Sequence, residues 1–405
     1  MNIIIAWRNI WRNKKRTFIT ISSVTLAVVL AIFMRSFQEG TYGVMIENAV
    51  GKFTGYVQVH QKDYWEDKTI DNGMTVSPLL LKEINSIPEI EGCNLRLESF
   101  SLASYQKNTK GTMIMGIEPE KEDRLIGLKS KMIKGEYIDA QDQSIILGSG
   151  LAKYLAVDVG DTMVLMGQGH WGQSAIGAYP IKGIIKMPSP VINKQIVFMP
   201  LSLARQFFSF DNGTTSIVVK INDPDDTDEI AAAINSKIDT TQYQAMVWQK
   251  MSPEVVQQIE GDKAGGIIMI AILYLIIAFG VFGTVLMMAQ ERKREFAVMV
   301  SIGMQKTKLM LISFYEAILM NSVGVLLGIL LTIPIVIYYN INPITLTGEM
   351  AASMEQFGIE PILPTSLDVS IFINNTLIII IITAIAAIYP LFTILKMNVI
   401  KSLRG

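Results

Sequence analysis

The sequence predicts an α-helical polytopic membrane protein with four transmembrane helices and a large α/β (α+β) extracytoplasmic domain inserted between helices 1 and 2. Three observations support this fold class. Of the 405 residues, 50 % are hydrophobic and only 18 % are charged, whereas charged residues make up about a quarter of an ordinary soluble domain. Four apolar stretches are long enough to cross a bilayer. Between the first two lie residues 38–264, a segment large enough to bury a hydrophobic core of its own.

The same composition excludes several classes of protein. The chain has 35 Lys and Arg against 36 Asp and Glu, so it lacks the basic excess of a nucleic-acid-binding protein. Its hydrophobic content excludes a disordered chain. The single cysteine, Cys93, allows no internal disulfide, and two histidines, His60 and His170, offer little for His-based chemistry or a Cys/His metal site. We therefore expect no cofactor, no metal ion and no nucleic-acid partner.

A helix needs about 20 predominantly apolar residues to cross the roughly 30 Å hydrocarbon core. The stretches of this length with almost no charge are residues 17–37, 265–290, 309–339 and 369–395. A basic segment precedes the first of them, as in a secretion signal. No A-x-A cleavage site follows it, however, and Arg35 stands near its end. We expect this stretch to remain in place as a signal-anchor helix.

The distribution of lysine and arginine predicts the orientation. Residues 38–264 hold many of them, but long translocated domains do not follow the charge rule. Outside that segment, lysine and arginine gather in residues 1–16, 291–308 and 396–405, and none occurs from residue 309 to residue 395. Cytoplasmic loops carry the excess of Lys and Arg, so we expect both termini in the cytoplasm. Residues 38–264 and the short loop 340–368 then lie on the opposite, periplasmic side.

Residues 38–264 show mixed α and β periodicity. Alternating apolar residues predict a strand at 56–60, and apolar runs fit strands at 144–147, 163–166, 196–199, 216–221 and 244–248. Helical patterns cover 78–87, 151–155 and 227–238. Gly148 and Gly150 begin like a dinucleotide-binding fingerprint, but Lys153 stands where its third glycine would be needed. We interpret this segment as a tight strand-to-helix turn.

The loop between the second and third apolar stretches predicts a short amphipathic helix. On a helical wheel, one apolar stripe flanked by charge contains Phe296, Met299, Val300 and Gly303 or Met304. Such a helix either inserts into a groove on a soluble partner or lies at the membrane surface near anionic lipid. The spacing alone does not decide between these two placements.

The third apolar stretch contains two candidate features. Glu316 is its only charge and lies seven residues past Leu309. Carboxylates within membrane segments are usually functional; for Glu316 we expect a structural or coupling role rather than proton transfer. Gly324 and Gly328 form a G-x-x-x-G motif, which permits close approach of two helices.

Two segments outside the apolar stretches also have predicted structures and roles. Residues 1–16 predict an amphipathic elbow helix at the membrane surface, whose one face carries Ile3, Trp7, Ile10, Trp11 and Lys14. His170 and Trp171 lie among glycines, which indicates a loop tip. They are candidates for contact with a carrier or a substrate.

Five segments carry a resemblance that spans nearly the whole chain. They are AWRNIWRNKKRTFIT at 6–20, residues 148–161 with 181–200, ERKREFAVMVSIGMQKTKL at 291–309, Glu316 with Gly324 and Gly328, and the tail from Tyr389-Pro390 through Lys401-Ser402-Leu403-Arg404. Together they resemble the FtsX-like permease family, the group of ABC transporter membrane subunits that includes MacB, LolC, LolE and FtsX. Residues 148–161 and 181–200 resemble the MacB-like periplasmic core domain.

The resemblance implies a permease subunit of the bacterial inner membrane that dimerises with itself or a paralogue. It would sit on two copies of a separate ATPase, which binds ATP and Mg²⁺ and closes against the cytoplasmic segment. That segment corresponds to the family's coupling helix, within 291–308, and its candidate contact residues are Glu291, Arg292, Glu295, Phe296, Met299, Val300, Gly303 and Met304. The resemblance implies mechanotransmission to a domain of two lobes, the inserted lobe at about 134–200. The chain lacks a G-x-x-x-x-G-K-[ST] phosphate loop, so we do not expect it to hydrolyse ATP.

Three functions are compatible with these features of the sequence. The first is lipoprotein release from the inner membrane, in the manner of LolC and LolE, with a periplasmic carrier or adaptor. The second is MacB-like export of peptides, antibiotics or other amphiphiles. The third is an FtsX-like signalling scaffold that activates a cell-wall hydrolase and transports nothing. An enzyme is the least favoured class because the sequence shows no acid-base or metal cluster.

Overall fold

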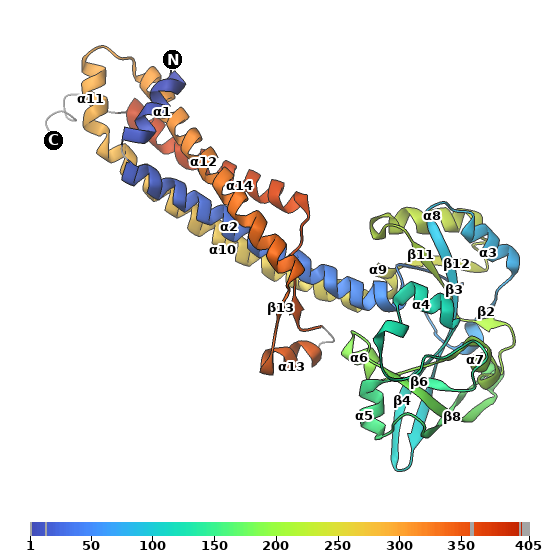
Figure 1. Cartoon of the computed structure of the whole chain (residues 1–405). Coiled ribbons are helices and arrows are strands. Elements are labelled where there is room, and N and C mark those ends of the chain that lie inside the picture. The colour runs from blue at the N-terminus through green and yellow to red at the C-terminus, as the bar shows by residue number, and fades with distance from the viewer. Residues whose placement is uncertain (1, 13, 357–359, 397, 399–405) are drawn as a thin grey trace. The chain divides into compact units, whose positions relative to one another are not determined.

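The chain forms two compact units in the computed structural model, which describes residues 2–12, 14–356, 360–396 and 398 (Figure 1). The helical unit comprises residues 1–43, 259–345 and 362–405, and the α/β unit comprises residues 44–258 and 346–361. The end of the tail that carries part of the family resemblance, residues 399–405, lies outside the described residues.

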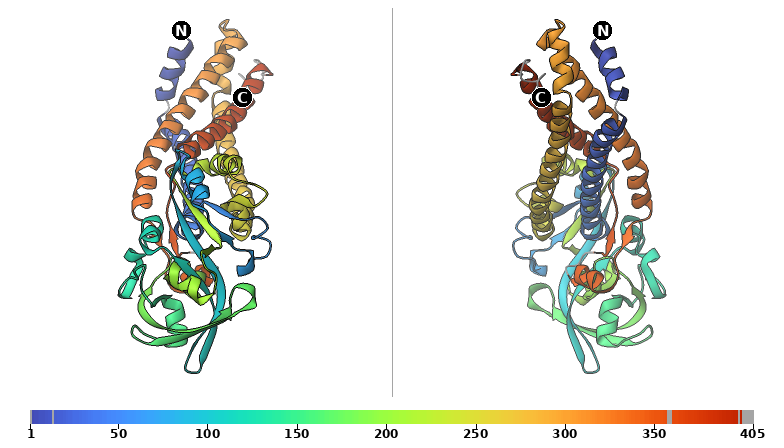
Figure 2. Two further views of the ribbon diagram at one scale, coloured as in Figure 1. Left: turned by 90° about the vertical axis from the view of Figure 1, so that its right-hand side faces the viewer. Right: turned by 90° about the vertical axis from the view of Figure 1, so that its left-hand side faces the viewer.

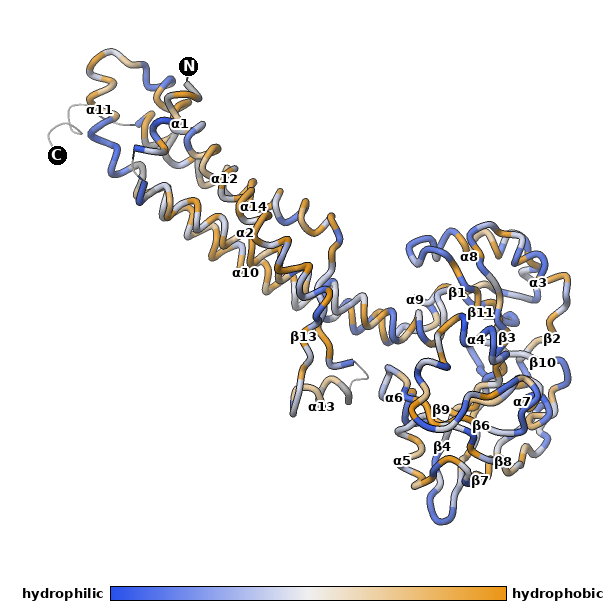
Figure 3. The backbone as a smooth tube through the Cα atoms, in the orientation of Figure 1, coloured by the Kyte–Doolittle hydropathy of each residue, from blue (hydrophilic) through white to orange (hydrophobic). Residues whose placement is uncertain are grey.

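Four helices of the described chain are long and apolar enough to cross a membrane, at residues 17–54, 253–287, 306–341 and 369–386. The predicted membrane class and the four transmembrane helices are confirmed. Figure 3 shows their continuous hydrophobic stretches. The helical elements of this unit are α1 (Asn2–Arg12), α2 (Lys14–Ile46), α10 (Pro253–Glu291), α11 (Lys293–Ser301), α12 (Lys306–Ile341) and α14 (Val369–Leu395).

Two of these helices extend far past the apolar stretches. Helix α2 continues without a break into the π-helix η1 (Glu47–Thr54), and α10 begins at Pro253, well before residue 265. Between α12 and α14 the chain forms a small antiparallel pair, β13 (Ile344–Thr345) and β14 (Ile362–Leu363). Helices α1 and α11 lie at the same end of the helical unit as the last turn of α14, which we call the α11 end (Figures 1 and 2).

The bundle is held by an apolar seam. Its buried members come from all four long helices and include Val28 of α2, Val281 of α10, Val325 of α12 and Ile379 of α14. Without a strong hydrophobic driving force between helices in lipid, such contacts depend on close packing.

One ten-stranded sheet organises the α/β unit. Its order is β12-β1-β11-β3-β4-β9-β6-β8-β5, and β7 pairs with both β3 and β8. The strands are β1 (Val57–Gln61), β3 (Ile90–Tyr105), β4 (Asn108–Ile117), β5 (Met132–Gly135), β6 (Ile145–Gly148), β7 (Thr162–Gln168), β8 (Ser174–Ile185), β9 (Ile196–Pro200), β11 (Ser216–Ile221) and β12 (Tyr243–Val247). A separate two-stranded sheet pairs β2 (Met74–Thr75) with β10 (Gly213–Thr214).

Short helices complete the α/β unit. They are α3 (Pro78–Asn85), α4 (Pro119–Ile126), α5 (Ser149–Leu155), α6 (Pro190–Asn193), α7 (Leu201–Phe207), α8 (Thr227–Lys237), α9 (Trp248–Met251) and α13 (Gly348–Gln356). Ser77 caps α3 by accepting a hydrogen bond from the Leu80 amide, and Pro78 occupies the first turn. This arrangement is a common start for a short helix, because proline there sacrifices no helical hydrogen bond.

The α/β unit has separate hydrophobic cores, which divide it into two lobes. One core takes residues from both ends of the segment, 57–93 and 217–247, and packs β1, β11 and β12 with α3 and α8. Apart from Ile70, the second core takes its buried residues from 97–210. The inserted lobe therefore contains more of the chain than the expected residues 134–200. The long β3–β4 hairpin also belongs to it, because β4 pairs in parallel with β9.

Candidate functional site

The α11 end of the helical unit contains the segment expected to meet an ATPase. Helix α11 spans Lys293–Ser301, and Gly303 follows it with a φ of 101°. Only glycine adopts this left-handed backbone without strain. Gly303 therefore ends the helix and lets the chain turn into α12 at Lys306.

The apolar stripe of α11 packs inside the chain. Phe296 is only 6 % exposed and lies in a cluster with Ala297, Leu309 of α12 and Ile394 of α14. The partly buried Met299, Val300 and Met304 pack against this cluster. The sequence suggested a partner's groove or the lipid surface for this stripe, whereas the structure places it against the ends of α12 and α14.

The outer face of α11 has a different composition. Val298 and Ile302 are exposed, Ile302 to 82 %, and they lie one turn apart beside the exposed Arg294. Glu291 and Glu295 are also exposed. The helix therefore offers a surface with two apolar side chains amid charges, and these apolar residues were not among the predicted contacts.

Glu316 forms a buried ion pair with Arg292. The Arg292 guanidinium, from the junction of α10 and α11, donates from Nη1 to Glu316 Oε2. The side chains are only 6 % and 1 % exposed. A carboxylate among apolar helices is costly unless an opposite charge neutralises it, so this pair fastens the start of α11 to α12.

Further polar contacts tie the other elements together at this end. Arg12 of α1 pairs with Glu295 of α11. Lys306 at the start of α12 donates to the main-chain oxygen of Leu395 at the end of α14, at 3.2 Å. These contacts join α1, α11, α12 and α14.

The elbow helix α1 divides into two faces, and these separate Ile10 from the two tryptophans that were expected to share its face. Ala6 and Ile10 are buried, whereas Trp7 and Trp11 are exposed and lie edge to face with ring centroids 5.8 Å apart. Exposed tryptophans beside basic residues are typical of the membrane interface. The face that carries the two tryptophans is therefore suited to the bilayer surface.

The two glycines of the G-x-x-x-G motif lie against α2. A Cβ atom added at Gly324 would be 2.8 Å from Val24 Cβ, and one added at Gly328 would be 2.6 Å from Val28 Cβ. Thr25 Oγ1 donates to the Gly324 oxygen at 3.0 Å. The motif thus provides close backbone contact between α2 and α12, as small residues do in membrane helices.

His170 and Trp171 lie in the turn between β7 and β8. The His170 ring stacks on Phe210 with centroids 4.1 Å apart, and its amide donates to the Phe208 oxygen at 2.8 Å. Trp171, in contrast, is 76 % exposed, and Asp71 Oδ1 accepts its amide hydrogen bond at 2.6 Å. His170 is therefore held in place by its neighbours, and Trp171 is the member of the pair that projects.

An exposed apolar row crosses the strands beside this turn. It consists of Leu102 of β3, Met166 of β7 and Ile176 of β8, which occupy paired positions in the sheet. Phe100 and Val164 are exposed next to it, while Leu165 on the opposite face is buried in the core. An apolar face of this kind in addition to a buried one marks an interaction surface.

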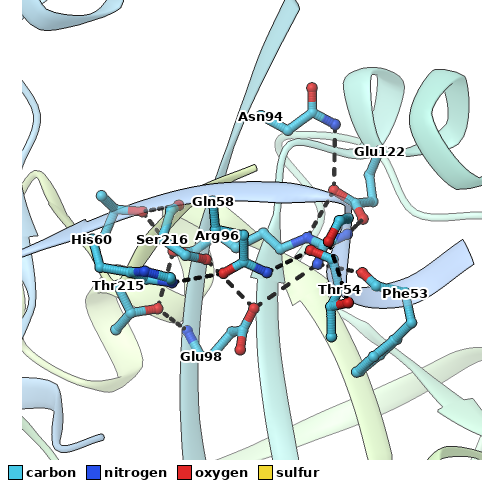
Figure 4. Close-up of polar contacts among 12 residues, drawn as sticks. Phe53, Thr54, Gln58, His60, Asn94, Arg96, Glu98, Glu122, Thr215 and Ser216 are labelled. Carbon is cyan, nitrogen blue, oxygen red and sulfur yellow. Dashed lines mark hydrogen bonds and ion pairs between the residues drawn. The ribbon is translucent and has the colours of Figure 1, made fainter. Parts of the chain in front are cut away.

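The α/β unit also buries a charged network that the sequence reasoning missed (Figure 4). Arg96 of β3 and Glu122 of α4 are fully buried and form an ion pair, Nη2 to Oε1, of 2.5 Å. Arg96 Nη1 also donates to the main-chain oxygen of Phe53 at 2.6 Å, and Gln58 Nε2 donates to that of Thr54. Both acceptors lie in the last turn of η1, where carbonyl groups lack partners within the helix.

His60 extends this network. Its Nε2 lies 2.7 Å from Gln58 Oε1, while its ring is buried against Tyr64 and Trp65. Burial, with a smaller contribution from the charge of Lys68, lowers the pKa of His60 to about 3. The sequence signal for this network is the alternation Asn94-Leu95-Arg96-Leu97-Glu98, which places three polar residues on one face of a strand.

Across the described ranges, no group of three or more His, Cys, Asp or Glu side chains is arranged to hold a metal ion. Cys93 is buried, and burial raises the pKa of its thiol to about 12. A buried thiol that stays protonated is a poor nucleophile and a poor metal ligand.

Two family models together match most of the chain. Residues 17–237 match the model of the MacB-like periplasmic core domain, and residues 267–399 match the FtsX-like permease C-terminal model. A curated relative is the macrolide export ATP-binding/permease protein MacB of Acinetobacter baylyi, 21 % identical over 332 residues, which cover 79 % of this chain and 49 % of the relative. The chain thus spans about half the length of that relative.

Two solved structures are also similar to this chain. The extracellular domain of the noncanonic ABC-type transporter YknZ from Gram-positive bacteria is 12 % identical, with 47 % of this chain and 100 % of that domain covered and a TM-score of 0.34. The periplasmic region of MacB from Actinobacillus actinomycetemcomitans is 14 % identical, with 53 % and 97 % covered and a TM-score of 0.35.

Proposed function

The chain belongs to the FtsX-like ABC transporter permease family of the MacB/LolC type, and we propose that it is the permease subunit of a lipoprotein-releasing complex in the bacterial inner membrane. In this proposal both termini are cytoplasmic, the α/β unit is periplasmic, and two permease subunits work with a separate ABC ATPase dimer. The partner ATPase binds ATP and Mg²⁺, because this chain contains no phosphate-loop motif.

The outer face of α11 supports the assignment of the ATPase contact. Phe296 is held in the chain's own core, so the apolar atoms free to enter a partner's groove are those of Val298 and Ile302. An exposed apolar pair on a charged surface is typical of a helix that docks into a groove. We therefore propose that Val298 and Ile302, together with Glu291 and Glu295, meet the ATPase.

The inner face of α11 supports mechanotransmission. A push on α11 acts on α12 through the buried Arg292–Glu316 pair and through the packing of Phe296 on Leu309. Buried pairs and packed side chains transmit displacement because they yield little. The motion then continues along α12 and α14, so these contacts couple the ATPase to the bundle.

The apolar row of Leu102, Met166 and Ile176 is the observation that leads us to favour lipoprotein release over the other functions. A lipid-modified cargo, or a carrier that accepts its acyl chains, requires an exposed apolar surface on the transporter's periplasmic side. Trp171, exposed in the adjacent turn, supplies an aromatic contact of the kind found at interfaces. MacB-like export of another amphiphile remains the second candidate, because the matched relative is named for macrolide export.

Co-purification tests the ATPase contact. We expect an ABC ATPase to remain bound to the tagged, detergent-solubilised protein, and the variant Val298→Asp/Ile302→Asp to lose at least about tenfold of it. Ile133→Asp, which changes an exposed isoleucine of β5, is the matched control and should retain the ATPase. Absence of any ATPase from the wild-type protein would reject the proposed complex.

The identity of the cargo is tested by a second measurement on the same purified samples. Mass spectrometry of the bound material should detect lipoproteins with the wild type, and Leu102→Asp/Ile176→Asp should lose them while keeping the ATPase. Binding of unmodified peptides or small amphiphiles instead of lipoproteins would favour the export function. A cell-wall hydrolase as the only periplasmic partner would favour the signalling function.

A further inference from the structure

A long groove runs along the membrane face of α2 and α12. It has a volume of about 1020 Å³, and its walls carry Phe18, Leu26 and Val29 from α2 and Leu327, Leu330 and Leu331 from α12. The close contact of Gly324 and Gly328 with α2 brings the two backbones together. The large side chains on either side of this contact form the walls of the groove.

The charge in this groove lies at one end only. Lys14 and Lys15 line it at the α11 end, next to Trp11, and none of the described residues that line it is acidic. Both lysines are exposed, and neither has an ion-pair partner among the described side chains. The groove is therefore cationic at the α11 end and apolar along the rest of its length.

The length of the groove matches one leaflet of a bilayer. From Lys14 to Val29 it follows α2 for about 22 Å, at 1.5 Å per residue. Half of a bilayer, headgroups included, is about 20–22 Å thick. A phosphate at the lysines thus places the acyl chain of the same molecule along the leucines.

We propose that this groove is a binding site for an anionic phospholipid of the leaflet that faces the α11 end. The phosphate pairs with Lys14 and Lys15, Trp11 lies at the headgroup level, and one acyl chain occupies the furrow between α2 and α12. Charge complementarity selects this occupant, because a helix of a second copy would not need two unpaired lysines at the α11 end. The bound lipid fixes the junction of α1 and α2 at the membrane surface.

Lipid retention tests the proposal. The full chain is reconstituted in bilayer nanodiscs that contain equal amounts of phosphatidylglycerol and phosphatidylcholine, then released, and the bound lipid is measured by native mass spectrometry. We expect the wild type to retain phosphatidylglycerol, and Lys14→Gln/Lys15→Gln to reduce this retention by on the order of tenfold. The control Lys308→Gln/Lys396→Gln removes two exposed lysines near the same end that do not line the groove.

A second variant tests the apolar part of the site. Leu26→Trp fills the furrow and should reduce phosphatidylglycerol retention with both lysines in place. Equal retention of the two lipids by the wild type, or retention unchanged in Lys14→Gln/Lys15→Gln, would overturn the proposal. So would cross-linking of Leu330→Cys to its equivalent in a second copy, which would make the groove an interface between copies.

The same samples separate this proposal from the proposed function. Neither Val298 nor Ile302 lines the groove. Loss of the co-purified ATPase with phosphatidylglycerol still bound would therefore affect only the proposed function. Loss of phosphatidylglycerol selectivity with the ATPase still bound would affect only the lipid site.

Discussion

The burial of Arg96 imposes three structural requirements on the α/β unit. Its buried guanidinium must be neutralised by Glu122, must satisfy the Phe53 carbonyl, and must fit between strands without contact with water. Helix η1, which continues α2, therefore ends on a charged side chain of the sheet. Positive charge at the carboxyl end of a helix is favourable, so the Arg96 guanidinium also stabilises the end of this long helix.

The cost of breaking this pair should differ sharply from the cost of replacing it. Arg96→Met leaves the buried Glu122 without its neutralising charge and should lower the free energy of unfolding by about 3–5 kcal/mol. The double variant Arg96→Met/Glu122→Leu removes both charges and should recover most of that loss. Calorimetry of the detergent-solubilised chain would measure both. A double variant no more stable than Arg96→Met would contradict this account.

His60 predicts a pH dependence of stability. Its pKa of about 3 in the folded chain lies below the value of about 6.5 expected after unfolding. Between these values the unfolded chain binds more protons, so stability falls as the pH falls. From pH 7 to about pH 5 the loss due to His60 is about 2 kcal/mol.

Thermal unfolding of wild type and His60→Gln over this pH range measures the effect. The variant should be less sensitive to acid, because the glutamine does not titrate. His170→Gln removes the other histidine of the chain and is the matched control for a histidine-to-glutamine change elsewhere. An equal acid sensitivity in wild type and His60→Gln would show that other groups dominate.

At the scale of the element, the contact of α12 with α2 depends on two glycines. Gly324→Leu and Gly328→Leu each place side-chain atoms where Val24 and Val28 already lie. Each should cost about 1–3 kcal/mol, because the helices must separate to accept the larger side chain. Gly283→Leu in α10 is the control, since nothing lies within 4 Å of its added Cβ.

Unfolding in a titration with a denaturing detergent would measure these costs. A loss for Gly283→Leu equal to that for Gly328→Leu would assign the effect to helix hydrophobicity rather than to packing. Thr25→Val is a milder test of the same contact, because it removes only the hydrogen bond to the Gly324 oxygen. Such bonds between membrane helices contribute about 0.6 kcal/mol.

Helix α11 illustrates what a periodic pattern can and cannot predict. The spacing correctly indicated a helix with one apolar stripe. The helix ends at Ser301, however, so Gly303 and Met304, which were also expected on it, lie beyond its end. The spacing could not indicate what covers the stripe, because Leu309 and Ile394 reach it from other helices. Likewise, the sequence singled out Glu316, but its pairing with Arg292 depends on how α11 and α12 pack.

The β3–β4 hairpin was missed for a local reason. Its turn is Gln106-Lys107, and Gln106 adopts a φ of 51° without the Asn-Gly or Asp-Gly pair that usually signals such a turn. Residues 99–105 of β3 include three serines and an alanine, which carry a weak strand signal. The strand at 216–221, rich in valine and isoleucine, was predicted with its observed bounds.

At the scale of the whole molecule, hydropathy alone was sufficient to predict the four membrane helices. Each apolar stretch must be long enough to cross the bilayer by itself, so each can be recognised without knowledge of the others. The order of the sheet is different. Strand β1 lies between β11 and β12, and β4 pairs with β9, so each pairing joins segments distant in sequence. No local pattern encodes these neighbours, and only the mixed α/β class was predictable.

The exposure of α10 predicts where two copies of the chain meet. Only 11 % of its apolar window is buried within the chain, against 39 %, 39 % and 28 % in the other three helices. We expect Ile272→Cys in α10 to form cross-linked dimers several times more efficiently than Leu377→Cys in α14. The two side chains are equally exposed, at 55 % each, and the native Cys93 is buried. Equal cross-linking would place the contact elsewhere.

The first and last strands of the α/β unit, β1 and β12, have a consequence for how such proteins diversify. Val57 of β1 pairs with Val247 of β12, and the Trp248 amide donates to the Tyr56 oxygen at 2.9 Å. The segment thus leaves its helical neighbours and returns to them through one hydrogen-bonded strand pair. Segments whose two ends are adjacent are readily inserted or exchanged. Residues 57–247, which exclude the 346–361 part of the α/β unit, therefore form one continuous segment that a single recombination event can exchange while the membrane helices stay unchanged.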